Sequence, residues 1–89
     1  MKEIIFSKNF KKEYKLMLKR GKNPAKMTEI LSILSAGETL PSKFRDHKLI
    51  GQYKGSRDLH IEPDWILIYK TTQNAVIFER TGSHSDLFK

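Results

Sequence analysis

The spacing of apolar residues changes once along this chain, and that change limits the folds open to it. Up to Gly37 the apolar side chains recur every three or four residues, roughly as on one face of an α-helix. From about Gln52 onward they alternate with polar residues or form short β-branched and aromatic runs, which is typical of strands. The sequence therefore predicts helices first and a run of consecutive strands afterwards.

The first part of the chain predicts a short strand and two helices. Residues 2–6 form an apolar, β-branched run, and Ser7 or Asn9 can cap the helix that follows. Gly21 is a natural end for that helix. Asn23 and Pro24 suit the first positions of a second helix, which Gly37 ends. The apolar faces of the two helices consist of Phe10, Tyr14, Met17 and Leu18, and of Met27, Ile30, Leu31, Ile33 and Leu34.

The second part predicts a sheet. A connecting segment is expected to run from Leu40 to about Gly51, with one helical turn at 43–46. Strands are expected at 57–62, 65–69 and 75–81, separated by a Pro63 turn and a polar loop at 71–74. Residues 83–88 form a short tail. The predicted fold is α+β, with an N-terminal strand and an αα-hairpin packed on one face of a mainly antiparallel sheet.

The chain is short and contains no cysteine. We expect its 89 residues to form a single domain, 1–89, with a compact core. The absence of cysteine excludes disulfides and thiolate metal sites. No apolar run is long enough for a signal peptide or a bilayer span. These features predict a cytoplasmic protein that has no membrane partner.

The positive charge is concentrated at the N-terminus. Residues 1–26 carry nine Lys or Arg residues and two Glu residues, which accounts for the whole net charge of +7. Such a local basic field favours a polyanionic partner, although a solvated helix face that only confers solubility explains it equally well. The lysines expected on the outer face of the first helix are Lys8, Lys11, Lys12, Lys15 and Lys19.

All three histidines lie in the second part of the chain. In the pattern Arg57-Asp58-x-His60-x-Glu62, the alternation of a strand places Asp58, His60 and Glu62 on one face. Carboxylates beside an imidazole raise its proton affinity and can fix its tautomer. Arg80 and His84 lie at the end of the hairpin that follows, in and just after the strand expected at 75–81. Arg80 is expected on the same face of that strand as Val76 and Phe78. The sequence predicts that Arg80 and His84 approach the same site.

Together, these imidazoles, carboxylates and the guanidinium of Arg80 supply the groups for general acid–base catalysis and a cation that stabilises a developing anion. RNA carries its own nucleophile, the 2′-OH, so a ribonuclease needs a base, an acid and a cation but no metal. Trp65, Tyr53 or Phe88 can stack on an unpaired base. The same residues also fit a solvated polar strand face, and Trp65 fits a core position. The spacing matches no compact zinc motif, so no metal and no cofactor are expected.

Four longer motifs resemble one known family. They are Asp46-His47, the segment Leu49–Gly55, the segment Arg57–Lys70 and the segment Phe78–Phe88. Together they closely resemble the YafQ group of bacterial toxins in the RelE/ParE superfamily. The resemblance covers about the last 50 residues densely and the helical half only by pattern.

The resemblance implies a RelE-like fold and the toxin of a type II toxin–antitoxin pair, an endoribonuclease that cuts mRNA on the ribosome. Its implied partners are a cognate antitoxin, the ribosome and mRNA, with a monomer alone and a hetero-oligomer with the antitoxin. The implied catalytic residues are His47, Asp58, His60, Asp64, Arg80 and His84. The resemblance also implies functional roles for Trp65 and Phe88, which we expect to bind substrate, and we expect Lys54 and Arg57 to bind it as well.

We expect His60 and His84 to transfer protons, and Asp58 and Asp64 to orient or tune them. Arg80 is expected to stabilise the pentavalent phosphate, and His47 to assist at the edge of the site. A second interpretation is a non-catalytic or gyrase-directed superfamily member that acts only by binding and is neutralised by an antitoxin. Members of that branch share the fold without the histidine set, so the histidines favour the nuclease.

Overall fold

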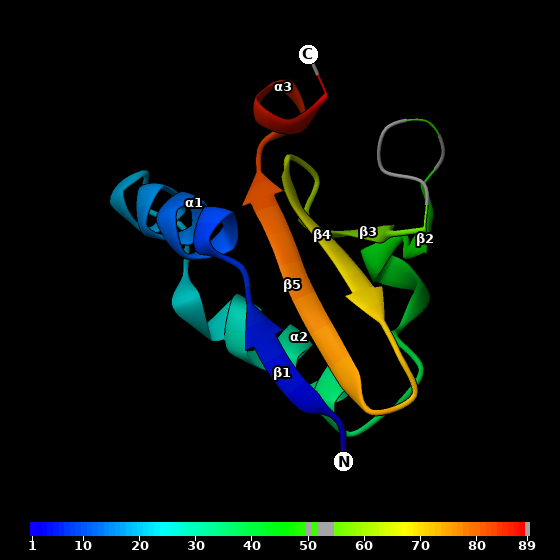
Figure 1. The fold of residues 1–89 in the computed structure, drawn as a ribbon. Helices are drawn as coiled ribbons and strands as arrows, with labels where there is room; N and C mark the ends of the chain where they lie inside the picture. Colours follow the sequence, from blue (N-terminus) through cyan, green and yellow to red (C-terminus); the bar gives the residue numbers. More distant parts are fainter. Residues whose placement is uncertain (50, 52–54, 89) are drawn as a thin grey trace.

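The computed structural model describes residues 1–49, 51 and 55–88 and contains one five-stranded sheet. The strands are β1 (Glu3–Phe6), β2 (His47–Lys48), β3 (Arg57–Glu62), β4 (Trp65–Thr71) and β5 (Ala75–Gly82). Their order across the sheet is β1-β5-β4-β3-β2 (Figure 1). Only β1 runs parallel to its neighbour, β5, and the other pairs are antiparallel. The predicted α+β fold with a mainly antiparallel sheet is confirmed.

Local sequence explains where the helices begin. In α1 (Lys8–Lys19), the Ser7 side chain accepts a hydrogen bond from the amide of Phe10 at 3.0 Å. In α2 (Pro24–Ser35), the Asn23 side chain accepts from the amide of Ala25 at 2.9 Å, and Pro24 occupies the first turn. Gly21 follows α1 with a φ of +91°, a left-handed conformation that glycine adopts without strain.

The two faces of the sheet are covered differently. The α1 and α2 side holds the main core, which includes Phe10, Met17, Met27, Ile30, Trp65 and Phe78. The other face carries a smaller cluster in which Leu87 of α3 (His84–Leu87) packs with Ile66 and Ile68. Among the described helices only α3 contributes side chains to this cluster, and we call this second face of the sheet the open face. No helix in the described part of the chain has the length and apolar character that crossing a membrane requires.

Two details differ from the sequence prediction. The connecting segment contains a short 3-10 helix, η1 (Ser42–Phe44), and the strand β2, where only one helical turn was expected. The ladder between β4 and β5 shifts register between Ile68 and Tyr69. Because Phe78 then pairs with Tyr69 and Arg80 with Ile68, the two residues lie on opposite faces, and the prediction that they share one was wrong.

Candidate active site

Asp58 is the centre of the histidine-rich face of the sheet. Its pairing partner on β2 is His47, whose Nε2 lies 3.0 Å from Oδ1 of Asp58. The Asp58 residue is only 4% exposed, and this burial raises the pKa of its carboxyl group above the ordinary value of 3.8. Although the two atoms are close, Oδ1 receives no directed hydrogen bond from a described residue. The contact is therefore an ion-pair contact of poor alignment.

The ring of His47 is oriented by the backbone. Its Nδ1 lies 2.9 Å from the carbonyl oxygen of Arg45, which can only accept a hydrogen bond. Nδ1 therefore donates, and Nε2 is directed to Asp58. The sequence left the position of His47 open, because β2 could not be recognised from two residues. The structure places it against Asp58 at the edge of the sheet.

His60 lies two residues after Asp58 on β3. It pairs with Ile66, as Asp58 pairs with Ile68, so both side chains project from the open face of the sheet. The Nδ1 atom of His60 lies 3.2 Å from the carbonyl oxygen of Pro63 and donates to it. This hydrogen bond leaves Nε2 of the neutral ring as an acceptor that can face a substrate.

His84 is held at the start of α3. Its amide donates to Oδ1 of Asp64 at 2.8 Å, and its ring centroid lies 5.1 Å from that of Phe88. Ser83 and Asp86 close the same turn with a capping box. The side chain of His84 is thus presented on the surface by a turn with several independent anchors. Asp64 acts on the backbone of His84.

The three histidines lie on different elements around Asp58. His47 of β2 pairs with Asp58 at the sheet edge, and His60 projects from the same face two residues further along β3. Burial is the main cause that raises the pKa of Asp58, Asp46 adds to it, and His47, His60 and His84 oppose it. That His60 and His84 act in one site stays a prediction.

Arg80 lies in the same row of the sheet as Asp58. The successive pairing partners across the strands are Asp58, Ile68 and Arg80, which puts about two strand spacings, roughly 10 Å, between Asp58 and Arg80. The guanidinium of Arg80 forms an ion pair with Glu13 of α1, including a contact of 3.0 Å from Nε to Oε2. Glu13 also accepts from the amide of Thr81 at 3.3 Å. Arg80 is therefore tethered at the border of the open face.

The role predicted for Trp65 is wrong. Trp65 is 0% exposed and belongs to the core beneath α1 and α2, so it cannot stack on an RNA base. Its Nε1 donates to Oγ1 of Thr81 at 3.0 Å, and that hydroxyl donates to the carbonyl of Ile66 at 2.8 Å. These bonds satisfy the buried indole and lock β4 to β5. Trp65 therefore stabilises the sheet that carries the site and does not contact the substrate.

Glu62 also departs from its predicted position. The register shift between His60 and Glu62 turns the Glu62 side chain to the helical face. There its carboxylate binds Lys26 at 2.7 Å and Lys22 at 3.1 Å. The prediction that Glu62 flanks His60 was wrong, because strict alternation fails at a bulge.

Two basic residues, Arg57 and Lys54, were predicted to bind substrate. Arg57 lies on the helical face opposite Tyr69, and its Nη2 binds Oδ2 of Asp46 at 2.9 Å. Asp46 also accepts a short hydrogen bond from Tyr69, so Arg57 and Asp46 anchor β3 to the segment before β2. Lys54 falls outside the described residues. The sequence reasoning assigned no role to Arg45, whose carbonyl orients His47.

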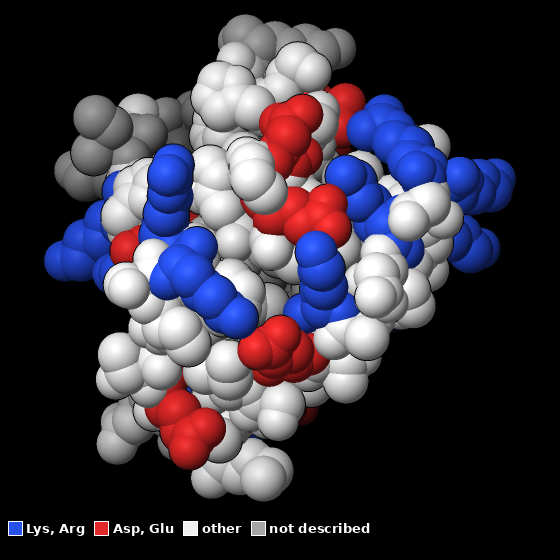
Figure 2. Space-filling view, turned by 180° about the vertical axis from the view of Figure 1, so that it is seen from behind, with Lys and Arg blue, Asp and Glu red and all other residues white. Residues whose placement is uncertain are grey.

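The lysines predicted on the outer face of α1 are all exposed, namely Lys8, Lys11, Lys12, Lys15 and Lys19. Figure 2 shows the molecule from behind. Basic side chains gather at the edge where α1 lies, and acidic and basic side chains alternate across the middle. Three of the five lysines, together with Arg80 and Glu13, line a shallow groove along α1. The described residues contain no group of three His, Asp or Glu side chains arranged to hold a metal ion.

Comparisons with known proteins show the family to which the chain belongs. Residues 2–89 match the family described as bacterial toxin of type II toxin–antitoxin system, YafQ. The mRNA interferase toxin YafQ of Escherichia coli K12 is 44% identical over 88 residues, which cover 98% of this chain and 96% of that protein.

Solved structures give the same result. The structure of the E. coli DinJ–YafQ toxin–antitoxin complex matches with a TM-score of 0.91 and 44% identity, covering 99% of this chain and 98% of that chain. A copper-bound mutant toxin from Helicobacter pylori matches with a TM-score of 0.93 and 35% identity, covering 99% and 100%. The fold is therefore that of a type II toxin. Within that class, the chain belongs to the YafQ family.

Proposed function

We propose that this chain is an mRNA interferase, an endoribonuclease that cuts mRNA on the ribosome and so inhibits translation. The observation that carries the proposal is the buried carboxylate of Asp58, with His47 at 3.0 Å and His60 two residues further along the same face of β3. The name of the E. coli relative, an mRNA interferase, supports the same activity. The reaction proposed is attack of the 2′-OH on the adjacent phosphorus, which yields a 2′,3′-cyclic phosphate and a 5′-OH.

His60 and His84 transfer the two protons in this proposal. Since Nδ1 of His60 donates to Pro63, its Nε2 is suited to accept the proton of the attacking 2′-OH. His84, on the opposite side of the site at the start of α3, then protonates the leaving 5′-oxygen as the bond from phosphorus to that oxygen breaks. Asp64 is a positioning residue for His84 through its backbone amide.

In this proposal, Arg80 and the pair of His47 and Asp58 stabilise the negative charge that develops on the phosphorane. An arginine fork binds the non-bridging oxygens of a phosphorane in a bidentate manner. In the free protein the guanidinium is held by Glu13, so substrate phosphate competes with or shares that contact. Phe88, which packs beside His84, is placed to stack on a base of the mRNA.

We also propose that the chain binds a cognate antitoxin and is a monomer without it. The E. coli relative has been crystallised as a DinJ–YafQ toxin–antitoxin complex. The exposed lysines of α1 form a cationic surface for an acidic antitoxin segment or for RNA phosphates. A cytoplasmic location follows from this proposal, because both the ribosome and its mRNA are there.

The test is to map transcript ends in cells that express the chain. Cuts phased with codons inside reading frames are expected for the native chain, and variants His60→Ala and His84→Ala should give at least about 100-fold fewer cuts. Cutting that persists in both variants would reject the catalytic assignment. DNA damage without mRNA cuts would instead identify a gyrase-directed toxin.

A further inference from the structure

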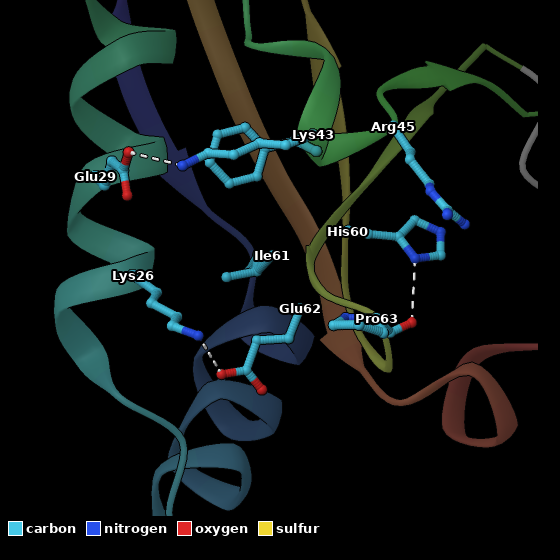
Figure 3. A pocket seen from close by; sticks show the side chains of 9 residues that line it. Lys26, Glu29, Lys43, Arg45, His60, Ile61, Glu62 and Pro63 are labelled. Atoms are coloured by element: carbon cyan, nitrogen blue, oxygen red, sulfur yellow. Dashed lines mark hydrogen bonds and ion pairs between the residues drawn. The ribbon is translucent and has the colours of Figure 1, made fainter.

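A charged hollow lies beside His60 on the side away from α3. Its volume is about 290 Å³, and it is bounded by α2, by η1 with the residue that follows, and by the end of β3. Figure 3 shows Arg45 and His60 at one end of the hollow, whereas Lys26 and Glu62 approach each other at the other end. Of the candidate active-site residues that the structure describes, His60 is the one that also lines this hollow, so the hollow lies beside the proposed reacting groups.

Arg45 is the most distinctive residue of the hollow. Among the described residues other than glycine, it alone has a positive φ, of 50°, a conformation that is strained for arginine. Its side chain is exposed and forms no ion pair with a described carboxylate, whereas Arg20, Arg57 and Arg80 all do. A planar guanidinium without a carboxylate partner is suited to bind an oxyanion in a bidentate manner.

The backbone of Arg45 also contacts the active site. Its carbonyl accepts the hydrogen bond from Nδ1 of His47, so the turn that presents the guanidinium also orients a site histidine. The left-handed conformation at Arg45 thus serves two purposes: its carbonyl faces His47 while its side chain points into the hollow (Figure 3).

The other charges of the hollow leave room for an anion. Lys26 and Glu62 neutralise each other at 2.7 Å. Lys43 is paired only weakly with Glu29, at 4.0 Å between side chains that are 67% and 52% exposed. An exposed pair of this length contributes little to stability, so Lys43 can turn toward an incoming phosphate. The aromatic ring in the hollow, Phe44, is 5% exposed and cannot act as a stacking platform for a base.

We propose that Arg45, assisted by Lys43, binds a phosphodiester of the RNA backbone that neighbours the scissile phosphate on the His60 side. The proposal rests on the proposed nuclease function and adds a subsite to it. A second anchored phosphate fixes the strand in line with His60 before cleavage. The same chemistry suits a phosphodiester of mRNA or of ribosomal RNA, and the mRNA strand is favoured because the hollow adjoins the reacting groups.

The variant Arg45→Asn tests the subsite with little risk to the fold. Asparagine tolerates a positive φ better than arginine, and the backbone carbonyl that orients His47 is retained. Lys2→Asn is the matched control. It removes one positive charge beside the 72–74 hairpin, where Lys2 binds the carbonyl of Thr72, and Lys2 does not line the hollow.

The probe is a short oligoribonucleotide whose scissile 2′-OH is replaced by hydrogen, so that it binds without being cut. Arg45→Asn should weaken binding about fivefold at low salt and reduce the salt slope by about 0.7, the value for one contact to single-stranded nucleic acid. Lys2→Asn should leave both quantities close to those of the native chain. On ribosomes programmed with mRNA, Arg45→Asn should raise KM more than it lowers kcat.

Replacing single phosphates of the probe by neutral methylphosphonates locates the contact. At one position, next to the scissile phosphate, the methylphosphonate and Arg45→Asn should not weaken binding additively. Additive losses at every position of the probe, together with a raised KM on ribosomes, would assign the contact to ribosomal RNA and overturn the proposal. Unchanged binding and salt slope in Arg45→Asn, with a native chain that cuts mRNA, would overturn the subsite alone. A native chain that neither binds nor cuts RNA would overturn the proposed function as well.

Discussion

Replacing Asp58 by asparagine should make the protein more stable and less active. The carboxyl group of Asp58 is almost completely buried, and asparagine has nearly the same shape. The substitution therefore removes a charge from a desolvated position without leaving a cavity. His47, the residue that faces Asp58, has a side chain that is 56% exposed and is solvated when the carboxylate is gone.

The sign of the stability change follows from the raised pKa of Asp58. A carboxyl group whose pKa is higher in the folded state than the ordinary 3.8 binds its proton more readily when folded. Its stabilising contribution is complete below pH 3.8 and is lost as the pH rises through the pKa of the folded state. Each unit of such a difference corresponds to about 1.4 kcal/mol. Because the pKa of Asp58 is raised in the folded state, the variant should be more stable than the native chain at neutral pH.

The activity should change in the opposite direction. An amide carries no negative charge, so it cannot form an ion pair with His47, whose Nε2 lies 3.0 Å from Oδ1 of Asp58. We expect mRNA cleavage to fall by at least about tenfold, within the range of about 100- to 10,000-fold that acid–base groups contribute. A group that is strained for function typically shows this opposition between stability and activity.

The assay is urea unfolding measured at a series of pH values from acid to neutral, because the stability difference should grow as the pH rises. Trp65 is the only tryptophan and is buried, so its fluorescence reports unfolding. Asp86→Asn is a control of opposite sign. Arg20 and the cap contacts of Ser83 lower the pKa of Asp86, so that variant should be less stable at neutral pH, with the difference vanishing in acid. An Asp58→Asn protein that is less stable than the native chain at neutral pH would refute the reasoning.

Substitutions at four further positions distinguish residues that take part in the reaction from residues that hold the site in place. His60→Gln should keep the fold and lower cleavage by about 100-fold or more, measured on programmed ribosomes; near-native rates would remove His60 from the reaction. Asp64→Ala should lower kcat by about tenfold by freeing the amide of His84, and Asp64→Asn, which keeps an acceptor, should largely restore it. Thr81→Val should lower the free energy of unfolding by about 1–3 kcal/mol in a urea titration, because the indole N–H of Trp65 loses its partner. Trp65→Phe should destabilise the chain in the same titration while RNA affinity, measured by fluorescence anisotropy, stays native. A loss of affinity that exceeds the loss of folded protein would contradict the core position of Trp65.

The sequence was sufficient for the two long helices, the three long strands and the fold class. Helix starts at Ser7 and Asn23, the end of α1 at Gly21 and the three long strands follow from contacts within a few residues. Such local preferences act within short segments and do not depend on the tertiary fold. Each of these elements can therefore be predicted from its own stretch of the sequence. The presence of Asp58 and His60 on one strand face was predictable for the same reason.

The composition of the site depended on contacts between distant residues. The two-residue strand β2 has no periodicity of its own, and only pairing with β3 places His47 at Asp58. Register shifts turned Glu62 toward α2 and Arg80 away from Phe78, because one extra residue reverses the face of every side chain beyond it.

Trp65 shows the same limit. Its pattern suited either a core residue or a stacking platform, and only the packing of α1 and α2 on the sheet decided for the core. The sequence alone thus determined which elements form and which chemical groups they carry. The tertiary structure decided which of those groups meet, because burial, register and the left-handed turn at Arg45 arise only when the distant segments pack together.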